Sequence, residues 1–153
     1  MNVLLSETPI GLLKIAEDGG AITEIRLAED SLPPDVELRE TPLLVEAKRQ
    51  LTEYFDGKRK VFGLPLAPKG TPFQQKVWAA LQTIPYGETR SYKQIAEQIG
   101  NPKACRAVGL ANNQNPIILV IPCHRVIGAD GRLVGYAGGV WIKEKLLELE
   151  QAK

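Results

Sequence analysis

The chain changes its pattern at residues 67–70, Ala-Pro-Lys-Gly, and this change predicts two small domains rather than one. Short apolar runs separated by turn residues precede this segment, whereas closely spaced helical patterns with recognisable caps follow it. A length of 153 residues permits two such domains and leaves no room for a large multidomain enzyme. We therefore expect an N-terminal domain over residues 1–70 and a C-terminal domain over residues 71–153.

The N-terminal domain is expected to form three strands followed by a helix. The apolar runs are residues 3–5, 12–16 and 22–27, and the turn formers between them are residues 8–11 and 17–20. Leu43, Ala47 and Leu51 then recur at helical spacing, which predicts a helix from Pro42 to Phe55. A broken apolar run over residues 61–66 is expected to form the end of a last strand before the linker.

The C-terminal domain is expected to contain closely spaced helices. Thr71 and Ser91 each have a glutamine three residues later, which is the pattern of a capping box, so a helix is predicted to start at each. A third helix is expected to begin at residues 101–102 and to run toward Asn112. Two short helices joined by a tight turn fit a helix-turn-helix that enters a DNA groove, and they fit a plain helical hairpin equally well.

The third predicted helix carries few side chains that could read bases. Only Lys103, Arg106 and Asn112 or Asn113 are candidates, whereas major-groove discrimination relies on bidentate Arg, Asn or Gln contacts. The small residues around them suit either a close approach to a DNA groove or tight helix packing.

The charge is unevenly distributed along the chain. Residues 71–153 carry ten Lys and Arg against six Asp and Glu, whereas residues 1–70 carry nine against twelve. A polyanion such as nucleic acid is one explanation, and chance is another.

The sequence disfavours several other classes of protein. No apolar run approaches the roughly 20 residues of a membrane helix, and the N-terminus lacks the pattern of a secretory signal. Two cysteines, Cys105 and Cys123, and one histidine are too few for a disulfide framework or a zinc site. We expect a cytoplasmic monomer with free thiols, no metal, no cofactor and no membrane contact.

The apolar residues 117–121 predict a buried strand that leads to Cys123 and His124. A thiol must lose its proton to attack carbon, and His124 could accept that proton, through water rather than directly because neighbouring side chains at a strand end point apart. Glu150, in the predicted C-terminal helix, could hold the imidazole in one tautomer. A cysteine in an apolar setting is also a common core residue, so the pair alone leaves both interpretations open.

The motif Pro-Cys-His-Arg-Val at residues 122–126 follows Arg-Ala-Val-Gly at 106–109 and Asn-Pro at 115–116. In these motifs the chain closely resembles the O6-alkylguanine-DNA alkyltransferases, also called methylated-DNA–protein-cysteine methyltransferases, over residues 72–150. The resemblance implies an α/β fold, with a ribonuclease-H-like N-terminal domain followed by a mostly helical winged-helix domain. It also implies repair of double-stranded DNA that contains alkylated guanine.

The implied reaction moves the alkyl group irreversibly from guanine O6 to Cys123, so that each molecule acts once. Minor-groove binding and flipping of the damaged base precede the transfer. O4-alkylthymine is a second candidate substrate.

The resemblance also implies roles for the catalytic residues. Cys123 is the alkyl acceptor, His124 the base that works through a bound water, and Glu150 the carboxylate behind it. Tyr92 donates toward N3 of the departing guanine, although it also suits a half-buried core position. Asn115 braces the turn before the reactive segment.

Further residues are implied at the DNA and the base. Arg106 fills the gap left by the flipped nucleotide, and Arg132 approaches phosphate from a wing, a hairpin over residues 127–134. Val126 and Cys123 offer carbonyls to the exocyclic amine of guanine. The remaining expected contacts are Tyr136, which stacks on the base, and Lys143, Ser91 and Lys103. Ala137 stands where most of the family has serine, so a hydroxyl contact to O6 is lost while the backbone N–H of Ala137 can still donate.

Two binding-only alternatives compete with this reading. Alkyltransferase-like proteins that only bind the lesion replace the reactive cysteine, which is present here as Cys123. A plain winged-helix regulator would need base-reading side chains over residues 102–112, where the sequence has few.

Overall fold

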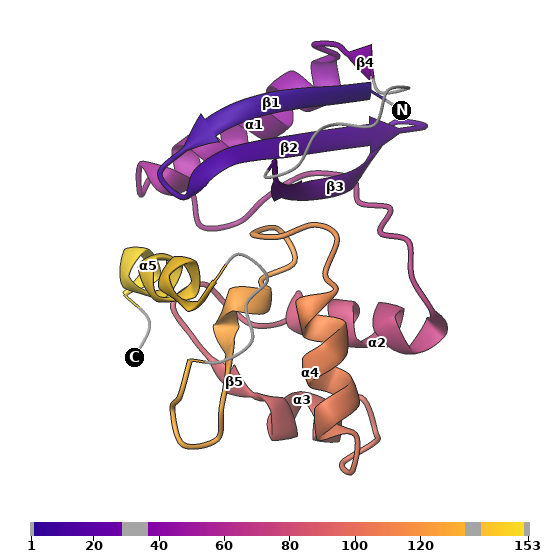
Figure 1. Ribbon diagram of the computed structural model, residues 1–153, viewed down its shortest axis with the longest axis vertical. Coiled ribbons are helices and arrows are strands. Elements are labelled where there is room, and N and C mark those ends of the chain that lie inside the picture. Colours follow the sequence, from indigo (N-terminus) through magenta and orange to yellow (C-terminus); the bar gives the residue numbers. More distant parts are fainter. Residues whose placement is uncertain (1, 29–36, 134–138, 152–153) are drawn as a thin grey trace. The chain divides into compact units, whose positions relative to one another are not determined.

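The computed structural model describes residues 2–28, 37–133 and 139–151. The chain divides into two compact units, Met1–Lys69 and Gly70–Lys153 (Figure 1). None of the described helices is long and apolar enough to cross a membrane.

A four-stranded sheet with the order β3-β2-β1-β4 forms the base of the first unit. Strand β1 (Asn2–Thr8) pairs antiparallel with β2 (Gly11–Asp18), which pairs antiparallel with β3 (Ala21–Leu27). Gly19 and Gly20 both have positive φ, which is the conformation that the tight turn between β2 and β3 requires. The three predicted strands are confirmed, but β4 (Glu37–Leu38), parallel to β1, was not predicted because two residues carry no periodicity.

Helix α1 (Pro42–Phe55) covers one face of this sheet and has the predicted bounds (Figure 1). Thr41 caps it, accepting a hydrogen bond from the Leu44 N–H at 3.2 Å, and Pro42 occupies the first turn. The helix and the sheet share a buried apolar core that consists of Val3, Leu13, Ile15, Ile22, Ile25, Leu44, Ala47, Leu51 and Tyr54.

The strand end expected over residues 61–66 is confirmed only at Leu66, which forms a parallel bridge with Ile22. The side chain of Gln50 on α1 binds both backbone groups of Gly63, accepting from its N–H at 2.9 Å and donating to its carbonyl at 3.2 Å. Since these groups are taken by a side chain, they are not available to a strand partner.

The second unit begins with two helices that start where the capping boxes predicted. In α2 (Pro72–Leu81) and α3 (Tyr92–Gln98) the caps are Thr71 and Ser91, and both reciprocal bonds with the glutamine three residues on are present. Helix α4 (Cys105–Asn113) packs against both of them, and the indole N–H of Trp78 donates to the Ala111 carbonyl at 2.9 Å.

The predicted start of α4 at residues 101–102 is wrong, since the helix begins at Cys105. Residues 101–104 form a turn that is closed by the Ala104 N–H on the Asn101 carbonyl at 3.0 Å. Pro102 stands at the second position of this turn, which its fixed φ favours.

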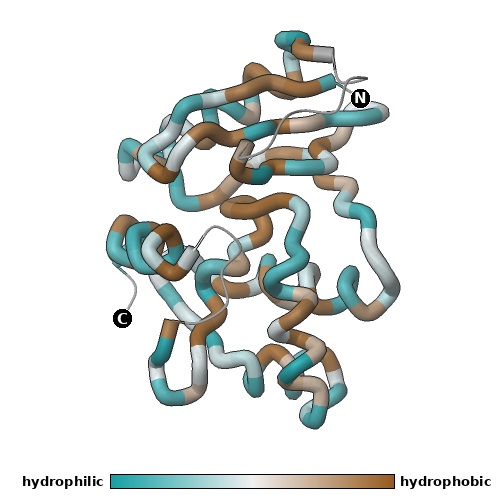
Figure 2. Tube along the Cα trace, viewed as in Figure 1, coloured by the Kyte–Doolittle hydropathy of each residue, from teal (hydrophilic) through white to brown (hydrophobic). Residues whose placement is uncertain are grey.

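The strand predicted over residues 117–121 is also wrong. This apolar segment, brown in Figure 2, forms consecutive turns in which the Ile121 N–H donates to the Ile117 carbonyl at 3.1 Å and Leu119 has a φ of 74°. Its burial, not strand pairing, explains its composition.

The rest of the second unit consists of short elements and a final helix. The 3-10 helix η1 (Cys123–Arg125) is followed by β6 (Val126–Ile127), which runs parallel to β5 (Arg90–Ser91), and the last helix is α5 (Val140–Glu150). The described part of the expected wing is a turn closed by the Gly128 N–H on the Arg132 carbonyl at 2.8 Å. Residues 134–138, which include the rest of that hairpin, lie outside the described residues.

Candidate active site

The reactive candidate lies in η1, where Cys123, His124 and Arg125 are all buried. The turn is held by the Arg125 N–H, which donates to the Pro122 carbonyl at 3.0 Å, and by the Val126 N–H, which bonds to the Cys123 carbonyl. The thiol and the only imidazole of the chain therefore occupy successive positions of one tight turn.

Two asparagines, one in the last turn of α4 and one just after the helix, fix the backbone on both sides of Pro122. Asn115 donates through Nδ2 to the Ile121 carbonyl at 2.7 Å and accepts from the Ile117 N–H at 3.0 Å. Asn112 donates through Nδ2 to the Cys123 carbonyl at 3.3 Å. Because Asn112 is only 1% exposed, its interpretation as a reader of groove edges is wrong.

A buried carboxylate lies behind the imidazole. His124 Nε2 and Glu150 Oε2 are 2.7 Å apart, and both side chains are fully buried. The structure thus brings together the histidine and the glutamate that the sequence paired across 26 residues.

Arg125 completes this network and was not predicted. Its Nε donates to Glu150 Oε1 at 2.8 Å, its Nη2 to Oε2 at 3.1 Å and its Nη1 to the Ile84 carbonyl at 2.7 Å. Its guanidinium also lies 5.7 Å from the centre of the Tyr86 ring. An arginine inside an otherwise apolar segment was the available signal, since such a charge requires a buried partner.

The electrostatics of the site favour a neutral Cys123 thiol and a neutral His124 imidazole before the reaction. Burial lowers the pKa of His124, although its bond to Glu150 acts in the opposite direction. Burial raises the pKa of the Cys123 thiol, against a hydrogen bond from Asn115 and the charge of Lys143. Since the imidazole donates Nε2–H to a carboxylate, the lone pair is on Nδ1, which is buried and has no hydrogen-bond partner among the described residues.

Tyr92 and Lys143 lie near the thiol from two other helices. Lys143 Nζ on α5 is 5.7 Å from the centre of the Tyr92 ring at the start of α3. Burial lowers the pKa of Lys143 to about 8, although the electrostatic interaction with Cys123 raises it. Burial, with a smaller contribution from Cys123, raises the pKa of Tyr92.

The residues expected to contact DNA lie at separate places in the second unit. Arg106 is exposed in the first turn of α4, and Lys103 is exposed just before this helix begins. Arg132 is exposed and lies 3.4 Å from the Asp130 carboxylate, and the Ser91 hydroxyl accepts from the Gln94 N–H as a helix cap.

Three further expected residues, Val126, Tyr136 and Ala137, were assigned to the base. Val126 is fully buried directly after η1. Tyr136 and Ala137 lie outside the described residues.

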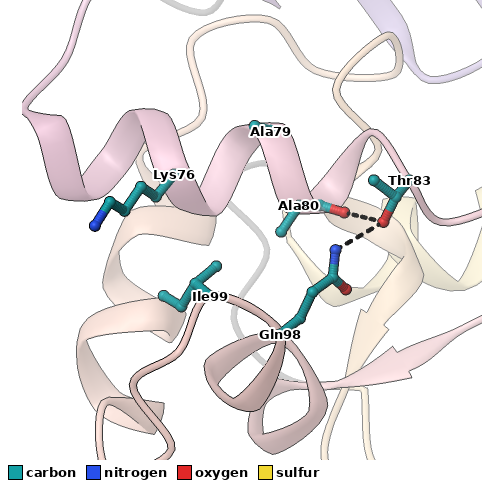
Figure 3. Close-up of a pocket in the computed structure, with 6 residues that line it drawn as sticks. All are labelled: Lys76, Ala79, Ala80, Thr83, Gln98 and Ile99. Carbon is teal, nitrogen blue, oxygen red and sulfur yellow. Dashed lines mark hydrogen bonds between the residues drawn. The ribbon is translucent and has the colours of Figure 1, made fainter.

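A separate pocket of about 380 Å³ lies between α2 and α3 and contains none of the predicted site residues (Figure 3). Its polar side is formed by Gln98, which donates to the Thr83 hydroxyl at 3.1 Å, and by Thr83, which donates to the Ala80 carbonyl at 2.6 Å. Within the described ranges no group of three or more His, Cys, Asp or Glu side chains could hold a metal ion.

Comparison with known proteins matches both units to one family. Residues 3–68 match "6-O-methylguanine DNA methyltransferase, ribonuclease-like domain" and residues 72–152 match "6-O-methylguanine DNA methyltransferase, DNA binding domain". These matches confirm the expected order of a ribonuclease-like domain followed by a DNA-binding domain.

Individual relatives span nearly the whole chain. The constitutive methylated-DNA–protein-cysteine methyltransferase of Bacillus subtilis is 53% identical, with 95% of this chain and 93% of the relative covered. The enzyme of that name from Methanosarcina acetivorans is 51% identical, with 98% of each chain covered. A crystal structure of Mycobacterium tuberculosis OGT in complex with DNA superposes with a TM-score of 0.92 at 48% identity, covering 99% of this chain and 93% of that one.

Proposed function

The chain belongs to the family of methylated-DNA–protein-cysteine methyltransferases, and from this premise we propose that it repairs duplex DNA by moving the alkyl group of O6-alkylguanine onto its own Cys123. The observation that carries this proposal is the buried thiol of Cys123 beside an imidazole that Glu150 holds at 2.7 Å. The reaction is a group transfer in which the protein is itself the acceptor.

The first step is removal of the thiol proton. A thiol whose pKa is raised by burial is protonated at neutral pH, so it needs a base at the moment of attack. His124 fits this role because its Nδ1 carries the free lone pair while Glu150 accepts Nε2–H. The proton passes from Sγ to Nδ1 through a water.

The second step is displacement at the alkyl carbon. The S–C bond forms as the C–O6 bond breaks, and the electron pair of that bond moves to the guanine. A hydrogen bond from the Tyr92 hydroxyl to guanine N3 stabilises the negative charge. Guanine takes up one proton, His124 gives up the one it received, and the products are S-alkylcysteine and guanine.

The transfer ends the activity of the molecule. A thioether does not release its alkyl group at neutral pH. Each protein molecule therefore repairs one base.

The second unit supplies the DNA contacts in this proposal. The exposed Arg106 on α4 fills the gap left by the flipped nucleotide after the helix enters the minor groove. Lys103 and Arg132 contact phosphate, and Tyr136 and Ala137 cover the base. O4-alkylthymine is a second candidate substrate.

We infer a reducing, cytoplasmic location for this reaction. Both cysteines are free, and a nucleophilic thiol has to remain reduced to act.

The direct test is mass spectrometry of the intact protein after incubation with duplex DNA that contains O6-methylguanine. Wild type and the control Cys105→Ser should each gain the mass of one methyl group, located on Cys123, whereas Cys123→Ser should gain none. The affinity of Cys123→Ser for DNA should stay within a few fold of wild type, because phosphate contacts dominate binding. Methyl uptake by Cys123→Ser would refute the assignment of the nucleophile.

A further inference from the structure

Leu110 is the only large apolar side chain on the exposed face of α4, a helix that the structure describes in full. It is 60% exposed, whereas Val108 and Ala111 on the same helix are buried. A single exposed leucine is common on a protein surface and needs no explanation by itself. The position of this leucine beside Arg106 is what connects it to the reaction.

Leu110 lies one helical turn after Arg106, which is also exposed. Residues four positions apart differ by about 40° around an α-helix, so both side chains leave α4 on one face. The exposed residues on the two sides of Leu110 are Ala107 and Asn113, which places the leucine at the middle of this face. A surface that receives Arg106 therefore also meets Leu110.

The proposed function makes this surface the minor groove of duplex DNA, because Arg106 reaches the base stack from there. Every base pair presents acceptor atoms at the floor of this groove, and a G·C pair adds the amine on C2 of guanine. One hydrogen of the amine pairs with cytosine, and the other points into the groove. The leucine side chain has no acceptor for it, so close contact displaces the water on the amine and replaces it with no hydrogen bond.

Resting on the function proposed above, we propose that Leu110 makes repair depend on the base pairs that flank the lesion. An apolar side chain at the floor of the groove makes a favourable contact beside a pair without the guanine amine and an unfavourable one beside a G·C pair. The protein therefore repairs O6-methylguanine faster between A·T neighbours, without any hydrogen bond from Leu110 to those bases.

The test uses two duplexes in which O6-methylguanine has either guanine or hypoxanthine on both sides, each paired with cytosine. Hypoxanthine is guanine without the amine on C2. Second-order rates of methyl transfer to Cys123 are measured under single-turnover conditions for wild type, Leu110→Ala and the matched control Leu38→Ala. Leu38 is 63% exposed in β4 of the first unit. Loss of the amine also weakens the flanking pairs, but this affects all three proteins equally, so the readout is the difference between their rate ratios.

The ratio of the hypoxanthine rate to the guanine rate should be about threefold to tenfold larger in wild type and Leu38→Ala than in Leu110→Ala. This is the effect of one hydrogen-bonding group left without a partner, and alanine is short enough to leave water on the amine. Because each ratio is taken on one sample, it does not depend on the fraction of folded protein. Equal ratios in wild type and Leu110→Ala overturn the inference. Failure of wild type to be alkylated by either duplex or by the free base O6-benzylguanine would instead refute the proposed function.

Discussion

Three buried side chains, His124, Arg125 and Glu150, form a hydrogen-bonded network in the second unit. Both Glu150 oxygens are bonded to Arg125, so the carboxylate is fixed while it orients the imidazole. Removing the charge of Glu150 would leave Arg125 buried without a counter-charge, which typically destabilises a protein by about 3–5 kcal/mol.

We therefore expect Glu150→Gln to lower both the free energy of unfolding and the alkylation rate. The Glu150 charge raises the pKa of His124 against the effect of burial, so its loss lowers that pKa further. The acid limb of the pH–rate profile with O6-benzylguanine should therefore move to lower pH while the maximal rate falls. Glu148→Gln, on the exposed side of α5, is the matched control and should leave the profile unchanged. A shift of the limb to higher pH would contradict this role of Glu150.

The positive charge of Lys143 lowers the stability of the folded protein. Its pKa falls from 10.5 to about 8 because the folded protein buries the ammonium group. Below pH 8 the lysine is protonated in both states and the folded state bears the desolvation. Between pH 8 and 10.5 only the unfolded state holds the proton, so the stability of wild type rises with pH through this lysine.

Lys143→Met should accordingly raise the free energy of unfolding by about 1–3 kcal/mol at pH 7, and the gain should shrink between pH 8 and 10.5. Denaturant unfolding at several pH values measures this difference, with the exposed Lys145→Met as control. The same variant should react more slowly, because the lysine charge favours the thiolate of Cys123. A constant gain across the whole pH range would show that the ammonium is not the cause.

At the scale of elements, α4 has two faces with different roles in the proposed function. Arg106 is on the exposed face, and Asn112 on the buried face holds the Cys123 carbonyl. If Arg106 fills the vacated stack, Arg106→Ala should slow single-turnover repair of duplex DNA much more than reaction with free O6-benzylguanine. Lys103→Ala, which removes the phosphate contact proposed for Lys103, should weaken binding but recover the full duplex rate at saturating protein. If Arg106→Ala also recovered the full duplex rate at saturating protein, Arg106 would only contact phosphate and would not fill the vacated stack.

The elements also show which parts of the fold a sequence can reveal. The starts of α2 and α3 were predictable because the caps Thr71 and Ser91 bond to residues three positions on. Helix α1 was predictable from the helical spacing of its apolar residues. Residues 117–121 misled because a β-branched apolar run has strand composition wherever it is buried, and its turns depend on the side chain of Asn115.

Within the candidate site, local motifs likewise indicated more than distant partners. The pentapeptide at 122–126 located the thiol and the imidazole, and the last helix supplied Glu150. Arg125 was overlooked because the motif does not show that its guanidinium is buried and shares the Glu150 carboxylate with His124. Asn112 was assigned to a DNA groove because nothing in the sequence says which face of a helix is buried against the active turn.

At the scale of the whole molecule, the charge of the two halves differs in sign. Residues 71–153 carry ten basic against six acidic side chains, and residues 1–70 carry nine against twelve. The basic residues expected to contact phosphate are Arg90, Lys93, Lys103 and Arg132. Two of these already have carboxylate neighbours, since Arg90 lies 3.2 Å from Glu88 and Arg132 lies 3.4 Å from Asp130.

Affinity for undamaged duplex DNA should therefore fall with salt, with a slope of log K against log[salt] between about −2 and −4. The steeper slope is expected if all four side chains neutralise phosphates and so release counterions from the DNA. The shallower slope is expected if only the exposed Lys93 and Lys103 do so, because a phosphate must first displace the carboxylate beside each arginine. Lys103→Gln should reduce the magnitude of the slope by about 0.9. Lys48→Gln, an exposed change on α1 in the acidic half, should leave it unaltered. A titration over a range of salt concentrations at constant pH measures each slope, and equal slopes for wild type and Lys103→Gln would remove this lysine from the DNA interface.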